Sequence, residues 1–132
     1  MSDHDAIRNT LARYCQLCDD GWFDEWAKLY TEDATFHVMG KVYRGRDEIK
    51  GFIQAGQPPQ MRGKHVATNS VIVVEGDQAT ARTDYLFVGR AGEGFAITNV
   101  GRYHDKLVRR GSEWLFSERR IVFLGDEPQG DA

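Results

Sequence analysis

The chain has 132 residues, a length typical of a single domain (1–132) that can bury a sizeable core. Hydrophobic residues make up 41% and charged residues 28%, a balance typical of soluble globular proteins. The net charge of −3 disfavours nucleic-acid binding, and no apolar run approaches the roughly 20 residues needed to span a bilayer. No charged-then-apolar leader opens the sequence, so we expect a cytoplasmic protein without a nucleic-acid or membrane partner.

The N-terminal third has the pattern of helices. Apolar residues recur at helical spacing from about residue 4 to 18, and Gly21 then ends this first predicted helix. A second, short helix carries Trp26 on its apolar side. The segment "TEDATFHV" alternates with a period of two and predicts a strand that contains Phe36. The segment "GRDEIKGFIQA" predicts a third helix, with acidic residues at its start, where the helix dipole favours them.

The rest of the chain is predicted to form four long strands joined by glycine-containing turns, which favour antiparallel neighbours. They cover residues 65–74, 78–89, 95–109 and 114–124, and about 126–132 are expected to form a frayed tail. Three N-terminal helices followed by these strands predict an α+β fold, in which the helices pack on one face of a bent antiparallel sheet. Such a cone-shaped arrangement encloses a cavity between its layers, where polar side chains would do chemistry.

Cys15 and Cys18 have the CxxC spacing, but no second pair completes a set of four zinc ligands. A redox pair would lie at a helix N-terminus after a strand, whereas these residues come late in a helix. We therefore expect two buried thiols, with neither a metal nor a cofactor.

Asp19 at the end of the first helix and His65 at the start of the first long strand are each unremarkable alone. Together they form a candidate acid–base pair, because a carboxylate bonded to one imidazole nitrogen fixes the tautomer and raises the basicity of the other. Tyr14 points roughly 140° away from Asp19 around the helix, yet both can border a cavity at the helix end.

Arg82, Asp84 and Leu86 share one face of a predicted strand. On the outer face of the sheet, the charged pair would be a weak ion pair exposed to solvent. On the cavity face, it would suggest a role in binding or acid–base chemistry. Because Leu86 is apolar and should face the helices, we expect this group to reach the cavity and line the ligand site with Trp26, Phe36 and Asn69.

The segments "YCQLCDDGWFDEWAKLYTEDATFHV", "KHVATNSVIVVEGDQATAR" and "GRYHDKLVRRGSEWLFSERR" resemble the SnoaL-like branch of the nuclear-transport-factor-2-like superfamily, over nearly the whole chain. The resemblance implies a cystatin-like fold. Bile-acid 7α-dehydratase and γ-hexachlorocyclohexane dehydrochlorinase, two members of this superfamily, use a His–Asp dyad that His65 and Asp19 match. Tyr14 matches an active-site tyrosine of the bile-acid enzyme. The resemblance thus implies a cofactor-independent lyase, a dehydratase or dehydrohalogenase, acting on a small hydrophobic or alicyclic molecule.

Other relatives match in part. Scytalone dehydratase shares the Asp and this His, but its second catalytic His has no counterpart near residues 98–101. Limonene-epoxide hydrolase has an Arg-x-Asp that Arg82 and Asp84 match, but its second Asp falls near Arg120. A hydrolase of this kind and an isomerase or polyketide cyclase are therefore alternatives.

The remaining alternative is a non-catalytic module that binds a ligand or a partner. The segment "DDGWFDEWAKLYTEDATF" is similar to the opening of aromatic-ring dioxygenase small subunits, which share this fold. For either class, we expect a homo-oligomer, a dimer or trimer, because an exposed apolar sheet face favours association.

Overall fold

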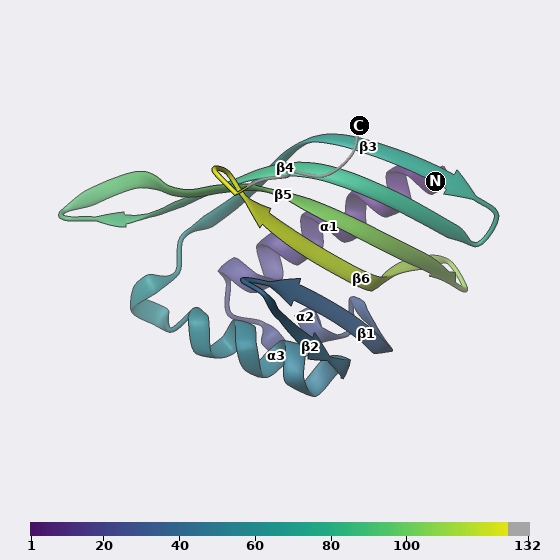
Figure 1. The fold of residues 1–132 in the computed structure, drawn as a ribbon, viewed down its shortest axis with the longest axis horizontal. Helices are drawn as coiled ribbons and strands as arrows, with labels where there is room; N and C mark the ends of the chain where they lie inside the picture. The colour runs from purple at the N-terminus through teal and green to yellow at the C-terminus, as the bar shows by residue number, and fades with distance from the viewer. Residues whose placement is uncertain (127–132) are drawn as a thin grey trace.

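Two layers make up the computed structural model, which describes residues 1–126: a twisted sheet of six strands and the helices that pack against it (Figure 1). The helices are α1 (Asp3–Asp19), α2 (Phe23–Ala27) and α3 (Gly45–Gly56), and a 3-10 turn, η1, spans Pro59–Met61. The strands are β1 (Tyr30–Val38), β2 (Lys41–Arg44), β3 (Lys64–Glu75), β4 (Gln78–Ala91), β5 (Gly94–Arg110) and β6 (Glu113–Phe123). The predicted α+β class and the four long C-terminal strands are confirmed.

The sheet differs from the prediction in composition and direction. Its strand order is β2-β1-β6-β5-β4-β3, and β1 runs parallel to β6, so the sheet is mixed rather than purely antiparallel. The three helices are not consecutive, because β1 and β2 separate α2 from α3. The short, largely exposed β2 lacks an alternating pattern and is stabilised by its pairing with β1, which sequence periodicity does not reveal.

Helix α1 lies behind the long strands in Figure 1 and contacts β3 and β6, while α3 lies beside β1 and β2. The oxygen of Ser2 accepts a hydrogen bond from the backbone N–H of Asp5 at 3.1 Å and caps α1. The apolar stripe of α1, including Ile7, Leu11 and Tyr14, is buried against the sheet. No helix among residues 1–126 has the length and apolar character of a membrane span. Most of the expected C-terminal tail lies outside the described residues.

Irregularities in the strands decide which side chains face the helices. The register of β3 shifts between Ala67 and Ser70. On the C-terminal side of this bulge, Ser70 and Ile72 face inward; an unbroken alternation would have turned His65 outward. The shift instead brings His65 and Ala67 to the inner face of the sheet.

Gly101 offers a test of close packing on that inner face. A β-carbon at this position would lie 2.7 Å from the Val122 carbonyl oxygen and 2.8 Å from the Tyr85 ring. We expect Gly101→Ala to lower the free energy of unfolding by about 1–3 kcal/mol, because backbone and a packed ring must both move. Gly51→Ala in α3, where nothing lies within 4 Å, should be neutral or stabilising. Urea denaturation measures both, and equal effects of the two substitutions would contradict the prediction.

Candidate functional site

A cavity of about 200 Å³ lies between α3 and the inner face of the sheet. Most of its lining is aromatic or aliphatic, and the polar groups come from a few side chains on different elements. The lining residues are Tyr14, Phe36, Val38, Met39, Phe52, Ile53, Gly56, Gln57, His65, Tyr85, Phe87, Asn99, Ile121 and Phe123. An apolar pocket with a few converging polar groups is typical of small-molecule sites.

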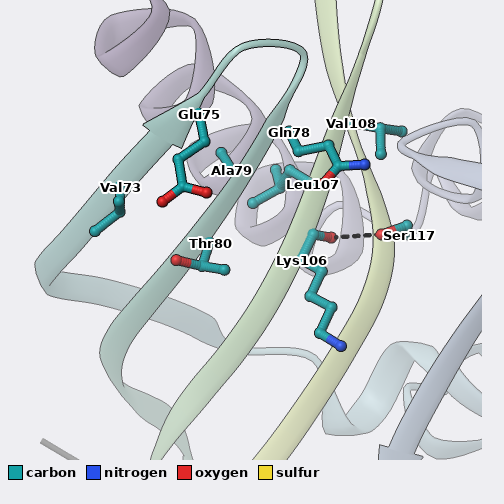
Figure 2. Close-up of a pocket in the computed structure, with 9 residues that line it drawn as sticks. All are labelled: Val73, Glu75, Gln78, Ala79, Thr80, Lys106, Leu107, Val108 and Ser117. Atoms are coloured by element: carbon teal, nitrogen blue, oxygen red, sulfur yellow. Dashed lines mark hydrogen bonds between the residues drawn. The ribbon is translucent and has the colours of Figure 1, made fainter.

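A larger hollow of about 350 Å³ is lined by residues of β3, β4, β5 and β6, near the turn that joins β3 to β4 (Figure 2). Figure 2 shows the charged ends of Glu75 and Lys106 well apart, and the dashed line joins the Ser117 hydroxyl to the Lys106 carbonyl oxygen at 3.2 Å. This hollow does not bring an acid and a base together, so we place the candidate site in the smaller cavity.

Asp19 and His65 meet at the edge of that cavity. Asp19 is the last residue of α1, and His65 is the second residue of β3. The Nδ1 atom of His65 lies 2.6 Å from Oδ1 of Asp19, and the backbone N–H of His65 donates to both carboxylate oxygens at 3.1 and 3.0 Å. The side chains of Asp19 and His65 are 2% and 10% exposed. With Nδ1–H donating to the carboxylate, Nε2 carries the lone pair and is the ring nitrogen left to a molecule in the cavity.

Aromatic rings hold the imidazole in place. The Phe87 ring lies opposite His65 on β4, with centroids 4.6 Å apart, and the Tyr14 ring meets the imidazole edge-on at 6.4 Å. Burial raises the pKa of Tyr14 far above its usual value, although the charge of Arg119 opposes this rise. The Tyr14 phenol therefore stays protonated at neutral pH, so its O–H is able to donate a hydrogen bond.

The buried ion pair of Arg119 and Asp105 was not identified from the sequence. The guanidinium Nε and Nη2 atoms each donate to the Asp105 carboxylate at 2.7 Å, and both side chains are almost fully buried. The guanidinium carbon lies 4.2 Å from the ring centroid of Tyr14 and 3.7 Å from that of Tyr103. A register shift in β6 turns Arg119 inward. The only signal in the sequence is an acid in the apolar row of β5, between Tyr103 and Leu107.

The expectation that Arg82, Asp84 and Leu86 reach the cavity is wrong. The side chains that alternate with them on β4 are the buried ones, so these three lie on the opposite, outer face of the sheet. Asp84 accepts a hydrogen bond from Nε of Arg102 at 2.7 Å, and this interaction is the main cause of its lowered pKa. Asn69 also lies on the outer face, where its amide donates to Asp84 at 3.5 Å.

The apolar character of Leu86 does not identify the inner face, because the outer face also carries apolar side chains. Among them are Val71 and Val73, which are about half exposed. Of the two aromatic residues expected at the site, Phe36 lines the cavity. Trp26 is fully buried behind it, between Tyr14 and Tyr30, and does not line it.

The two thiols are buried, as their position predicted. Burial raises the pKa of Cys15 to about 11 and that of Cys18 to about 12, so both remain protonated and unreactive at neutral pH. Within residues 1–126, no cluster of His, Cys, Asp and Glu is suited to hold a metal ion.

Residues 1–120 match the family model of the SnoaL-like domain. A nuclear-transport-factor-2-like protein with a cystatin-like fold from Novosphingobium aromaticivorans is 26% identical with a TM-score of 0.85, over 96% of this chain and 84% of that one. A candidate scytalone dehydratase from the same organism is 25% identical with a TM-score of 0.81, over 92% and 83% of the two chains. The anthranilate 1,2-dioxygenase small subunit of Burkholderia cepacia is 19% identical in an alignment 129 residues long, which covers 84% of this chain and 80% of that subunit. The cystatin-like fold expected from the sequence is confirmed.

The Arg119–Asp105 pair makes a prediction about stability. Burial raises the pKa of Asp105, and the Arg119 charge opposes that rise. In Arg119→Met, the pKa should rise further, and the free energy of unfolding should fall by about 3–5 kcal/mol at neutral pH. A carboxyl whose pKa is raised in the folded state destabilises it increasingly as the pH rises through that pKa, so acidification should restore part of the loss.

Urea denaturation at neutral pH and about pH 5 measures this effect. The double variant Arg119→Met/Asp105→Leu should lose less stability than Arg119→Met alone, because no carboxylate is left buried without a partner. The matched control is Arg102→Met, which removes the half-exposed partner of Asp84 on the outer face and should lower the free energy of unfolding far less than Arg119→Met does. A pH-independent loss in Arg119→Met would contradict the prediction.

Proposed function

The chain belongs to the SnoaL-like domain family, and on this premise we propose that it is a cofactor-independent lyase that removes water or halide from a small hydrophobic or alicyclic molecule. The observation that carries the proposal is the 2.6 Å contact between Asp19 and Nδ1 of His65 at the edge of an apolar cavity. A histidine held by a carboxylate in this way is equipped to take a proton from carbon.

The chemistry assigns one role to each group. Nε2 of His65 takes the proton from the carbon next to an activating group such as a carbonyl, and Asp19 stabilises the imidazolium that forms. The C–O bond on the adjacent carbon then breaks as the new C=C bond forms. Hydroxide recovers the proton from the imidazolium and leaves as water, so atoms and charge balance. Because no oxidation state changes, the elimination needs no redox cofactor.

Tyr14 would assist without ionising. Its buried phenol has a pKa raised far above the usual value, so it keeps its proton and can assist only by donating a hydrogen bond. Its ring lies 6.4 Å from the imidazole, within the same cavity. We therefore assign Tyr14 the stabilisation of the leaving group, or of the oxygen on which negative charge develops.

A β-hydroxy ketone tests this proposal, because 3-hydroxy-1-tetralone yields fluorescent 1-naphthol when it loses water. We expect turnover by the wild type and a loss of about 10²- to 10⁴-fold in His65→Ala, which lacks the base. Tyr14→Phe should reduce kcat more than it changes KM. Asp84→Asn, on the outer face, is the control and should retain wild-type rates.

Thermal melts establish that each variant is folded, which matters for Asp19→Asn because Asp19 also binds the backbone of His65. Equal rates for the wild type and folded His65→Ala would contradict the role of His65. A wild-type rate no faster than the uncatalysed reaction across a panel of cyclic β-hydroxy and β-halo ketones would contradict the lyase itself.

We also propose that the outer sheet face is an oligomer interface. Val71 and Val73 are 52% and 50% exposed on it, and the β4–β5 hairpin, which projects beyond the other strands in Figure 1, carries the exposed Phe95 and Ile97. Apolar side chains gathered on one face favour association of identical subunits.

Light scattering coupled to size-exclusion chromatography tests this second proposal. At micromolar concentration, we expect a mass of two or three times the 15.0 kDa of one chain. Val71→Asp/Val73→Asp should shift the protein to a monomer, whereas Met61→Asp, on the exposed η1 turn, should leave the mass unchanged. A wild type that elutes as a monomer would contradict the interface.

The outer face also supports a second candidate function, that of a non-catalytic subunit. The similarity to the anthranilate 1,2-dioxygenase small subunit, together with the exposed apolar side chains, favours a larger protein partner. This candidate requires His65→Ala to leave every measured function unchanged, and so the elimination assay separates it from the lyase.

A further inference from the structure

Three neighbouring strands place His65, Phe87 and Asn99 in one row across the inner face of the sheet. His65 pairs with Phe87 between β3 and β4, and Phe87 pairs with Asn99 between β4 and β5. All three residues line the cavity. Because adjacent strands lie about 4.8 Å apart, the backbones of His65 and Asn99 are about 10 Å apart. The imidazole of His65 therefore lies on one side of the Phe87 ring, and the amide of Asn99 lies on the other.

The alternation of β5 directs the amide into the cavity, because Asn99 is in phase with the buried Gly101 and Tyr103. The pairing of β4 with β5 shifts after Phe87, so that Val88 pairs with Ile97 and Thr98 is left over. This bulge re-aims the residues before it, so that Ile97 falls on the outer face, and bulges are frequent next to functional sites. Asn99 is half-buried on the inner side of this shift, whereas its neighbours Thr98 and Val100 are exposed.

Tyr85 completes the polar group at this end. Its ring stacks on that of Tyr103 with centroids 4.3 Å apart, and the missing side chain of Gly101 leaves room for it. Burial raises the pKa of Tyr85 to about 12, although a hydrogen bond from Asn99 and the charge of Arg119 oppose the rise. The phenol oxygen thus accepts from the Asn99 amide, and its own O–H is left to donate, as is the second N–H of the amide.

The remaining lining restricts the ligand to uncharged molecules. Apart from the imidazole of His65, no side chain of the lining set can carry a charge at neutral pH. The nearby buried cation, Arg119, is paired with Asp105 behind the rings of Tyr14 and Tyr103. A carboxylate in this cavity would lose its hydration without gaining a counter-ion. At the packing density of about 0.75 found in protein interiors, the cavity holds about 150 Å³ of ligand, which suits a bicyclic compound.

We propose that Asn99 and Tyr85 form a carbonyl anchor, which selects uncharged cyclic ketones and presents the carbon next to the carbonyl to Nε2 of His65. The ring of such a ketone would lie against Phe87, between the two polar ends of the row. The presentation of this carbon to His65 rests on the proposed lyase function. The anchor itself is a binding property, which can be measured without turnover.

Binding measurements with three matched probes test the anchor: 1-tetralone carries the carbonyl, tetralin lacks it, and 1-naphthoate carries a charge. We expect the wild type to bind 1-tetralone about 10-fold more tightly than tetralin and to bind 1-naphthoate most weakly, by calorimetry or tyrosine fluorescence. Asn99→Leu and Tyr85→Phe should each remove most of the preference for 1-tetralone and leave tetralin binding within about 2-fold.

Asn99→Asp keeps the shape of the side chain but loses the N–H donors, so it should also lose the preference for 1-tetralone. This variant serves as the test if Asn99→Leu does not fold. Unchanged 1-tetralone affinity in the folded Asn99 variants, equal wild-type affinities for 1-tetralone and tetralin, or no binding of either at millimolar concentration would each overturn the anchor. His65→Ala distinguishes the two proposals. If this variant keeps both the 1-tetralone preference and the elimination rate, the anchor is supported and the lyase is contradicted. If the Asn99 and Tyr85 variants keep the 1-tetralone preference while His65→Ala loses elimination, the lyase is supported and the anchor is contradicted.

Discussion

The carboxylate of Asp19 is the point on which the geometry of the cavity depends. It joins the last residue of α1 to the beginning of β3 through the backbone N–H and the imidazole of His65 at once. One buried acid therefore fixes both where the strand starts and which way the ring turns. The backbone comes close to its neighbours on both sides of this contact. A β-carbon on Gly21 would collide with the guanidinium of Arg62, and one on Gly63 would lie 2.1 Å from the Val88 carbonyl oxygen.

A continuous aromatic core supports this contact from behind. Tyr14 touches the rings of Trp26, Tyr103 and Phe116 as well as that of His65, and the guanidinium of Arg119 lies against it. Interiors packed in this way resist small displacements, because any shift of one ring must move several others. The site is thus built on a helix and strands rather than on loops, which favours a preorganised arrangement of its polar groups.

The two faces of the sheet differ in chemistry. The inner face offers a small cavity whose polar groups are an imidazole, two phenols and two amides, all uncharged at neutral pH except for the titratable imidazole. The outer face carries exposed valines and ion pairs such as that of Arg102 with Asp84. This division matches the functions proposed for each face. A cavity without charged groups suits a neutral ligand, and a surface of exposed apolar side chains and ion pairs suits contact with another protein.

The sequence by itself determined the helices and the four long strands, because periodicity is a local property of the chain. The pairing of Asp19 with His65 was implied by the family resemblance. The sequence did not determine which side of the sheet each residue faces. A period of two relates side chains only within an unbroken strand, and the bulges in β3 and β6 reset it, bringing His65 and Arg119 inward. The face on which Arg82 and Asp84 lie was likewise decided by where α1 packs, and the parallel pairing of β1 with β6 joins segments far apart in the chain. These features depend on contacts between distant segments, which only the tertiary structure brings together.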